Sequence, residues 1–467
     1  MVKASVLHRA FVVGAFLGTF VGTFVGTSSA AAACLSVEGE TNNSEQKANS
    51  GLCSGVGISG TVASARDDDW FRIDVASAGA VNISLAHDSG IDLDWTLFRP
   101  GGVAVTYRST LDNPEAGVYN APGAGTYYIR VRSNTGLGRY TLNVTYPSSG
   151  SGGGGGTAAC TLPRKVNLGK VGNATPKSSV TTGGIVLMGG GLDVDAAIKW
   201  MIARSGGGDF VVLRSSGTNA YNDYIYAMVG ANSVQTLLVT STTQANDACV
   251  VQTIKNAGAV FLAGGDQADY INNFKGQGVG NALNYLINTK RAPVGGTSAG
   301  MAIQGQYYHP GGADNTTALL NPTAVAIGNN FLAHSGLTNL ITESHFAERA
   351  RQPRLASFMA SSLYNYGAQW QAMRGVAADE GTAVAIDAGG IGSVYGSGNA
   401  HFVMATGAPE TLAPSTALTW LVGSQALKVF QVPATTSGAN SFNLGTWTGA
   451  SGTTHYWYVN NGALTVM

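Results

Sequence analysis

The run Gly296-Thr-Ser-Ala-Gly300 carries the clearest chemical signal in the sequence. It lies between an apolar run expected to form a strand, Ala292–Val294, and a helix expected over Ala299–Gln304. Small residues around a serine between strand and helix allow a sharp turn that lifts the hydroxyl out at the edge of a sheet. The helix N-terminus beneath it favours developing negative charge. We therefore predict that Ser298 is a nucleophile, in preference to a serine that only caps the helix.

A serine nucleophile needs a base, and five histidines outside the N-terminal part of the chain are candidates: His309, His334, His345, His401 and His455. His345 lies near the end of the run 340–346, which has the pattern of a strand that passes into a loop. In an ordinary α/β-hydrolase the histidine comes after the acid. That order would favour His401 or His455, but neither follows an acid in a strand–loop context. His345 is therefore the preferred base.

Three arginines follow this histidine within a short stretch: Arg349, Arg351 and Arg354. Such a cluster is unusual in a chain of which only 11% is charged. Pro353 suits the first turn of a helix that runs to Asn365, so the first two arginines belong to the loop beside the nucleophile. Guanidinium groups bind carboxylates bidentately, and the cluster therefore predicts a substrate that carries a carboxylate. The alternative is pairing with Glu348 and exposure to solvent.

Composition excludes several other classes of function. The 467 residues contain 26 basic and 26 acidic side chains, and no basic stripe occurs. Nucleic acid is therefore not an expected partner. The cysteines form no C-x-x-C pattern and nothing resembles a zinc motif, so neither a metal nor a cofactor is expected.

The N-terminus has the pattern of a secretory signal peptide over residues 1–33. Lys3 and Arg9 precede an apolar stretch at 10–25, and small residues with A-x-A-type spacing follow. The apolar stretch is short and contains Gly and Thr, which argues against a membrane span. Ala31 stands where a lipoprotein would have leucine before Cys34, so lipidation is disfavoured. We expect a secreted, extracellular protein, with a periplasmic or surface-bound location less favoured.

A Gly/Ser-rich run at 148–157 indicates a flexible linker and divides the chain into two domains. Export to an oxidising compartment favours disulfides. Given the boundary, the economical pairing is Cys34–Cys53 and Cys160–Cys249, with free buried thiols as the alternative.

Residues 34–147 predict a small all-β domain. Five short runs alternate apolar and polar residues between turn clusters: 70–75, 81–85, 94–98, 126–131 and 140–144. This spacing favours an antiparallel sandwich. The runs Asp68-Asp-Trp-Phe71, Gly125–Val131 and Gly138–Leu142 resemble the prepeptidase C-terminal (PPC) domain of secreted bacterial hydrolases. The acidic run Asp67–Asp69 could hold Ca²⁺, but a solvated entry to a strand is the preferred interpretation.

Residues 158–467 predict an α/β domain. Apolar runs expected as strands, 184–188, 210–213, 234–239 and 259–262, alternate with helical runs at 195–202, 249–254 and 280–288. The alternation indicates a mostly parallel sheet with helices on both faces. Ligands of such sheets bind beyond the carboxyl ends of the strands, where the serine turn and the histidine both fall.

Three motifs of this domain together resemble the cyanophycinases, a branch of the peptidase E-type serine peptidases. They are Gly295-Gly-Thr-Ser-Ala-Gly300, Gly264-Gly-Asp-Gln267 and Ser344-His-Phe-Ala-Glu-Arg-Ala-Arg-Gln-Pro-Arg-Leu355. The resemblance covers 183–386 and implies a class I glutamine-amidotransferase-like fold. The spacing of the arginines after the histidine is its most specific part.

The resemblance implies Ser298 as nucleophile, His345 as base and Glu380 as the acid that orients the histidine. Asp379 competes for the last role, and the family pattern favours Glu380. Backbone N–H groups that would stabilise an oxyanion are implied at Gly264, Gly265 and Ala299.

The implied substrate and partner is cyanophycin, a poly-aspartate whose β-carboxyls carry arginine through isopeptide bonds. Each attached arginine exposes an α-carboxylate, which suits the loop arginines, and a guanidinium, for which Glu343 is the expected partner. The family more often has Asp at this position, and the neighbouring Ser344 has no firm role. The implied substrate-binding residues are Gln267, Glu343, Ser344, Arg349, Arg351 and Arg354. The expected activity is release of β-Asp-Arg dipeptides through an acyl-enzyme.

Two other functions are alternatives. A peptidase E-like aspartyl peptidase acting on short peptides would share the nucleophile but would not require three arginines. A non-catalytic polymer-binding protein would keep only the scaffold. A class I glutaminase is disfavoured, because its nucleophile is a cysteine and Cys249 falls on an expected helix. Relatives with the implied fold are often dimers, so a homodimer is expected as one assembly.

Overall fold

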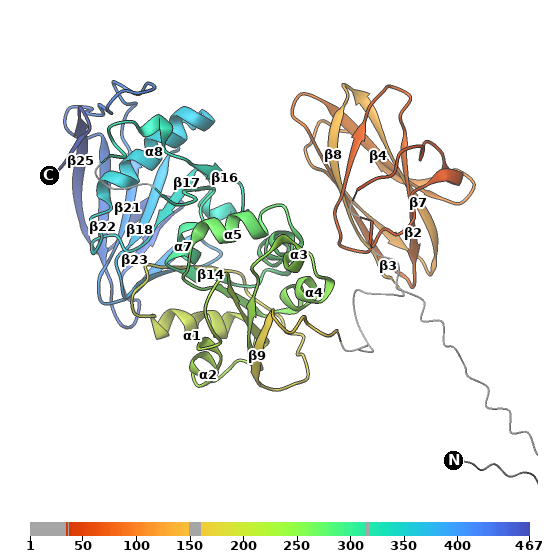
Figure 1. Cartoon of the computed structure of the whole chain (residues 1–467), viewed down its shortest axis with the longest axis horizontal. Coiled ribbons are helices and arrows are strands. Elements are labelled where there is room, and N and C mark those ends of the chain that lie inside the picture. The colour runs from red at the N-terminus through yellow and green to blue at the C-terminus, as the bar shows by residue number, and fades with distance from the viewer. Residues whose placement is uncertain (1–33, 36, 149–159, 313–316) are drawn as a thin grey trace, which may run out of the picture. The chain divides into compact units, whose positions relative to one another are not determined.

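The computed structural model describes residues 34–148 except 36, 160–312 and 317–467. The predicted signal peptide and residues 149–157 of the predicted linker lie outside the described residues. The chain divides into two compact units, Met1–Gly155 and Gly156–Met467, and Figure 1 shows the first in red to orange and the second in yellow to blue.

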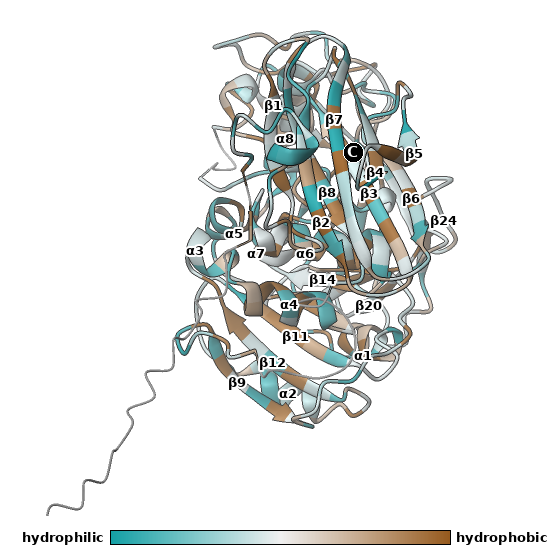
Figure 2. Ribbon diagram, turned by 90° about the vertical axis from the view of Figure 1, so that its right-hand side faces the viewer, coloured by the Kyte–Doolittle hydropathy of each residue, from teal (hydrophilic) through white to brown (hydrophobic). Residues whose placement is uncertain are grey.

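The first unit consists of two four-stranded antiparallel sheets with the orders β1-β8-β3-β6 and β2-β7-β4-β5. Its strands are β1 (Ile58–Val62), β2 (Asp69–Val75), β3 (Gly79–His87), β4 (Asp92–Arg99), β5 (Val103–Arg108), β6 (Glu115–Ala121), β7 (Gly125–Thr135) and β8 (Gly138–Thr145). One core joins buried side chains of both sheets, and Figure 2 shows the alternation of apolar and polar residues along β7 and β3. The predicted small all-β domain is confirmed, although the sequence pattern missed β1, β5 and β6.

The acidic run at the start of β2 is not solvated as predicted. Asp67 is 7% exposed and Asp69 is fully buried, with the Tyr140 hydroxyl donating to the Asp69 carboxylate at 2.8 Å. Burial, together with the charges of Glu38 and Asp67, raises the pKa of Asp69 to about 8. Of the three aspartates, only Asp68 is partly exposed. Its carboxylate oxygens lie 3.8 Å from guanidinium nitrogens of two arginines of β7. Neighbouring side chains of a strand point to opposite faces, so a run of three acidic residues does not reveal from the sequence which of them are buried.

The second unit begins with a ten-stranded sheet of the order β24-β23-β20-β19-β10-β14-β13-β11-β12-β9. Its strands are β9 (Asn167–Gly172), β10 (Ile185–Met188), β11 (Asp209–Arg214), β12 (Ser233–Leu238), β13 (Ala259–Leu262), β14 (Val294–Thr297), β19 (Thr382–Ile386), β20 (Ile391–Gly396), β23 (Ser441–Asn443) and β24 (Thr448–Gly449). The central strands β10, β14, β13, β11 and β12 are parallel, and antiparallel strands extend both sides. The sheet is therefore mixed, which corrects the prediction of a mostly parallel one.

Helices cover both faces of the parallel centre, as predicted. One face packs against α1 (Asp195–Arg204) and α2 (Tyr221–Tyr226), and the other against α4 (Ala248–Asn256), α5 (Gln267–Phe274) and α6 (Gly278–Tyr285). The central strands are buried on both sides, which is why they read as continuous apolar runs.

A second sheet of eight strands, β16-β15-β17-β18-β21-β22-β25-β26, was not anticipated. Its strands are β15 (Tyr307–Tyr308), β16 (Gly328–Asn329), β17 (Leu340–Glu343), β18 (Arg374–Ala378), β21 (Asn399–Ala405), β22 (Leu427–Pro433), β25 (Thr453–Asn460) and β26 (Ala463–Val466). One face packs against α8 (Gln352–Tyr366), and the other against the antiparallel part of the first sheet. Pro353 lies in the first turn of α8, as predicted, and Gly367 caps its C-terminus.

Two disulfides match the predicted pairing. Cys34–Cys53 lies in the first unit and Cys160–Cys249 in the second, with Cα atoms 5.4 and 5.5 Å apart. Among the described residues, no helix is both long enough and apolar enough to span a membrane.

Candidate active site

Ser298 occupies a strained turn between β14 and α7 (Ala299–Ala302). Its φ of 55° and ψ of −115° are unusual for a residue with a side chain. The close packing after the turn requires glycine at position 300, because a Cβ there would lie 2.1 Å from the carbonyl oxygen of Leu262. The Ser298 hydroxyl makes no capping bond to the helix, and its Oγ lies 2.7 Å from Nε2 of His345. The geometry is that of a nucleophile elbow and not of a capping serine.

His345 follows the end of β17, and its backbone is held in place by an N–H bond of 2.7 Å to the carbonyl of Gly189. Its Nδ1 lies 2.5 Å from Oε1 of Glu380, so the other ring nitrogen is directed at the serine. Burial lowers the pKa of His345, the hydrogen bond to Glu380 raises it, and the charges of Arg349 and Arg351 lower it again, with a net pKa below 6.5. The imidazole is therefore neutral near pH 7 and able to accept the serine proton.

The structure distinguishes the two neighbouring carboxylates that follow β18. Glu380 faces His345, whereas Asp379 accepts hydrogen bonds from Nε2 of His401 at 3.1 Å and from the Asn399 N–H at 2.9 Å. Asp379 also accepts from the N–H of Ala347, two residues after the histidine. Although burial raises the pKa of Asp379, these hydrogen bonds lower it more, so the carboxylate stays charged. Asp379 thus fixes the backbone just after His345, and Glu380 is the carboxylate in contact with the candidate base.

A glycine loop after β10, which was not among the predicted site residues, also lies against the candidate relay. Gly190 has a φ of 102°, and a Cβ there would lie 2.3 Å from Cε1 of His345. At Gly191, a Cβ would lie 2.6 Å from Oε2 of Glu380. The backbone therefore packs directly on the histidine and its acid, as only glycine allows. The sequence feature that could have predicted this loop as part of the site is the run Gly189-Gly-Gly191 at the carboxyl end of a strand.

Of the predicted oxyanion donors, Gly264 and Ala299 lie next to the serine, and Gly265 follows Gly264 in the chain. Gly264 follows β13, and a Cβ there would lie 3.4 Å from Cβ of Ser298. Ala299 begins α7, where helical N–H groups have no partner within the helix. Among the described residues, the N–H groups of Gly264, Gly265 and Ala299 donate to no protein acceptor. Gln267, at the start of α5, is partly exposed close to the same loop.

The arginine cluster differs from the prediction. Glu343 is 1% exposed, and its carboxylate accepts from Arg351 at 2.9 Å and from Arg354 at 2.7 and 2.9 Å. Glu343 is therefore already engaged, which corrects its predicted role as partner of a substrate guanidinium. Arg351 also donates to the carbonyl of Ser344 at 2.8 Å, so Ser344 contributes backbone to this cluster and its side chain is buried. Burial lowers the pKa of Arg351 to about 10.

The other candidate histidines have structural partners. His334 is buried, with Nε2 2.8 Å from the side-chain oxygen of Gln304, and burial lowers its pKa to about 3. His309 stacks on Phe358 of α8 with ring centroids 4.4 Å apart. His401 pairs with Asp379, and its ring also contacts that of Phe346. His455 lies in β25, on the second sheet.

Comparison with known proteins finds one matching family model for each unit. Residues 215–394 match the Peptidase family S51, and residues 67–133 match the Bacterial pre-peptidase C-terminal domain. The S51 match contains Ser298, His345 and Glu380. Both predicted resemblances are thus confirmed, and the match supports the serine-type peptidase class for the second unit.

Individual proteins are similar to parts of this chain. Cyanophycinase of Nostoc sp. is 25% identical over 190 residues, which cover 41% of this chain and 59% of that protein. Collagenase ColA of Clostridium perfringens is 31% identical over 110 residues, 23% of this chain and 10% of that protein. The crystal structure of a peptidase from an acI-B1 Actinobacterium, 16% identical, aligns with a TM-score of 0.35 over 48% of this chain and 91% of that chain. The chain spans less than two thirds of the length of these curated relatives.

Proposed function

We propose that this protein is an extracellular serine-type hydrolase that degrades cyanophycin to β-Asp-Arg dipeptides through an acyl-enzyme. The observation that carries the proposal is the relay from Ser298 Oγ to His345 Nε2 at 2.7 Å and from His345 Nδ1 to Glu380 at 2.5 Å. The similarity to cyanophycinases supports the choice of substrate.

In the proposed reaction, Ser298 attacks an amide carbonyl of the polymer backbone while its proton moves to Nε2 of His345. Glu380 stabilises the imidazolium and holds its tautomer. The negative charge on the carbonyl oxygen would be met by the N–H groups of Gly264, Gly265 and Ala299. His345 then gives the proton to the leaving amine, and water, activated by the same histidine, cleaves the ester.

Electrostatics support a substrate that carries carboxylates. The guanidinium groups of Arg351 and Arg354 both pair with the carboxylate of Glu343 in a largely buried cluster. Arg349 is exposed on the same loop, and its charge, like that of Arg351, acts on His345. We propose that Arg349 and Arg351 bind the α-carboxylate of the attached arginine. Glu343 would position the guanidinium groups of Arg351 and Arg354. Gln267 would contact the substrate.

We infer a class I glutamine-amidotransferase-like fold for residues 158–467, joined by the linker at 148–157 to a PPC-like domain at 34–147. The two disulfides and the PPC match suit a secreted protein whose signal peptide is residues 1–33. A homodimer is the assembly we propose to test first.

A peptidase E-like aspartyl peptidase acting on short peptides is the second candidate, because it would use the same relay. Arg351 separates the two functions. Its replacement in Arg351→Ala should greatly reduce turnover of cyanophycin but not of a short aspartyl peptide without an attached arginine.

The decisive experiment is incubation of the purified full-length protein with cyanophycin, followed by mass spectrometry of the soluble products. We expect β-Asp-Arg dipeptides with the wild type and none with Ser298→Ala. Intact polymer with the wild type would remove the substrate claim. Labelling of Ser298 by a serine-reactive probe would then still support a hydrolase, and absence of labelling would favour a non-catalytic binding protein.

A further inference from the structure

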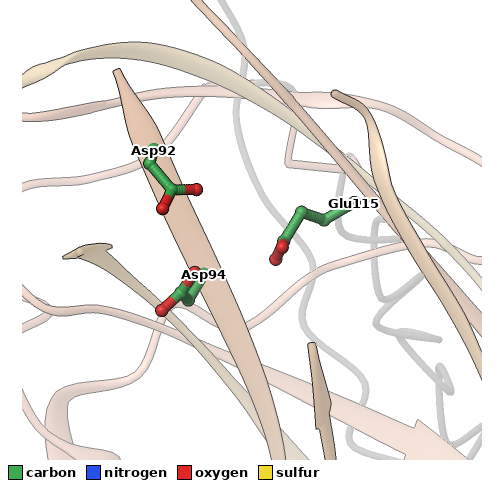
Figure 3. A group of neighbouring side chains, drawn as sticks. All are labelled: Asp92, Asp94 and Glu115. Carbon is green, nitrogen blue, oxygen red and sulfur yellow. The ribbon is translucent and has the colours of Figure 1, made fainter. Parts of the chain in front are cut away.

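Three acidic side chains lie close together in the first unit. Asp92 and Asp94 lie on β4, and Glu115 begins β6 in the other sheet of the sandwich. Residues two apart on a strand point to the same face, so both aspartates face the same way. Figure 3 shows the Glu115 carboxylate directed toward this pair. One oxygen of each carboxylate lies within 4.8 Å of an oxygen of the other two.

Each carboxylate is held by one donor and leaves its second oxygen without a partner. The donors to Asp92, Asp94 and Glu115 are, in that order, Asn134 Nδ2 at 2.8 Å, Ser109 Oγ at 2.9 Å and the Thr110 N–H. The remaining oxygens, Asp92 Oδ1, Asp94 Oδ1 and Glu115 Oε2, are buried and accept no hydrogen bond. Glu115 is fully buried and Asp92 is 5% exposed. Three oriented carboxylates that each offer one oxygen without a hydrogen-bond partner have the form of a cation-coordination site.

The cluster is unfavourable without a positive charge. Burial raises the pKa values of Asp94 and Glu115, and mutual repulsion of the carboxylates adds to the effect. In the part of the chain that the structure describes, none of the three forms an ion pair with Lys, Arg or His within 4.0 Å; Arg132 and His87 act on Asp94 only at longer range. Buried charges persist in proteins when they are paired or coordinate a metal.

We propose that Asp92, Asp94 and Glu115 bind a Ca²⁺ ion. Carboxylate oxygens are the ligands that Ca²⁺ prefers, and a spread of up to 4.8 Å is about twice the Ca²⁺–oxygen distance of roughly 2.4 Å. Mg²⁺, with oxygens at about 2.0 Å, would require the carboxylates to move closer together. Because the ligands come from both sheets, the ion links β4 to β6 and stabilises the sandwich. This inference does not depend on the function proposed for the second unit.

Calcium binding to the full-length protein tests the site directly. After removal of metal with EDTA, Ca²⁺ is titrated calorimetrically into the wild type, Asp92→Asn and Glu115→Gln. We expect each of the two variants to bind one Ca²⁺ fewer per chain than the wild type. The matched control is Asp74→Asn, because Asp74 is an exposed carboxylate of the same unit paired with Arg72 at 3.0 Å. Its stoichiometry should equal that of the wild type, and an equal stoichiometry in all four proteins would overturn the proposal.

Thermal unfolding provides a readout that does not require the variants to fold well. In about 5 mM CaCl₂, above the 10⁻⁴–10⁻³ M dissociation constants of extracellular calcium modules, the wild-type transition of the first unit should move to higher temperature than in EDTA. Neutralised variants should lose this shift. A wild type whose unfolding is the same in both buffers would show that the carboxylates bind no Ca²⁺, and the proposal would be wrong.

Discussion

Asp379 and Glu380 are adjacent in the chain, but their carboxylates accept hydrogen bonds from different histidines. Glu380 lies 2.5 Å from Nδ1 of His345, and Asp379 lies 3.1 Å from Nε2 of His401. Asp379 is 3% exposed, whereas the Glu380 side chain is 35% exposed. The two acids thus differ in their contacts: Asp379 belongs to a buried hydrogen-bond network, and Glu380 contacts the candidate base.

Removal of each carboxylate should therefore have a different consequence. Glu380→Gln should lower kcat by up to about 10⁴-fold, as loss of the orienting carboxylate does in a Ser-His-Asp triad, with little change in melting temperature. Asp379→Asn should instead destabilise the fold by about 1–3 kcal/mol, because it disturbs a buried hydrogen-bond network. Kinetics on cyanophycin and thermal unfolding measure both effects. A larger kcat loss in Asp379→Asn would reverse the assignment.

The pH dependence should report the pKa of His345. Only the neutral imidazole accepts the serine proton, so kcat/KM should fall at acid pH with a midpoint below 6.5, the ordinary histidine value. Arg349→Gln removes a positive charge that lowers this pKa, so the midpoint should move to higher pH. Glu380→Gln removes a contact that raises it, so the midpoint of the residual activity should move to lower pH.

Lys199→Gln is the control for this series, because Lys199 is exposed on α1 and its charge is not among those that act on His345. Its midpoint should match that of the wild type. Shifts of Arg349→Gln and Glu380→Gln in the same direction would contradict the electrostatic account.

The glycine loop beside the histidine should not tolerate a side chain. In Gly190→Ala the new Cβ would lie 2.3 Å from the imidazole, so His345 must move and activity should fall by at least about 10²-fold. Gly276→Ala is a matched control, since Gly276 also has a positive φ, 73°, but open space around it. Both should lose about 1–2 kcal/mol of unfolding free energy from backbone strain. Only the first should lose activity, and equal kcat values would exclude close packing on the base.

Loss of the Glu343 carboxylate should destabilise the second unit. Glu343→Gln removes the carboxylate that pairs with Arg351 and Arg354, and breaking a buried ion pair typically costs about 3–5 kcal/mol. Glu343→Asp keeps the charge and should retain more stability. Asp74→Asn, which breaks an exposed pair with Arg72, should cost less than about 1 kcal/mol. Denaturant unfolding of the three variants compares them, and similar losses for Glu343→Gln and Asp74→Asn would contradict the structural role.

Several features of the site were predictable because they depend on local sequence. The Ser298 turn requires small neighbours within a few residues, and α8 has Pro353 in its first turn and Gly367 as its C-cap. The parallel strands were recognisable because burial on both faces makes them continuously apolar. The sandwich strands followed from simple alternation. Each of these patterns lies within a single turn, strand or helix, which is why these features could be predicted from the sequence alone.

Only the tertiary structure decided which distant groups meet. It directed Glu380, not Asp379, to the histidine, and it paired Glu343 with Arg351 and Arg354. It also packed Gly190 against His345 and formed a second sheet from strands that pair far along the chain. Neighbouring residues differ in burial and partner because the backbone turns between them. Those partners are set by the packing of whole sheets, a property that no short run of sequence contains.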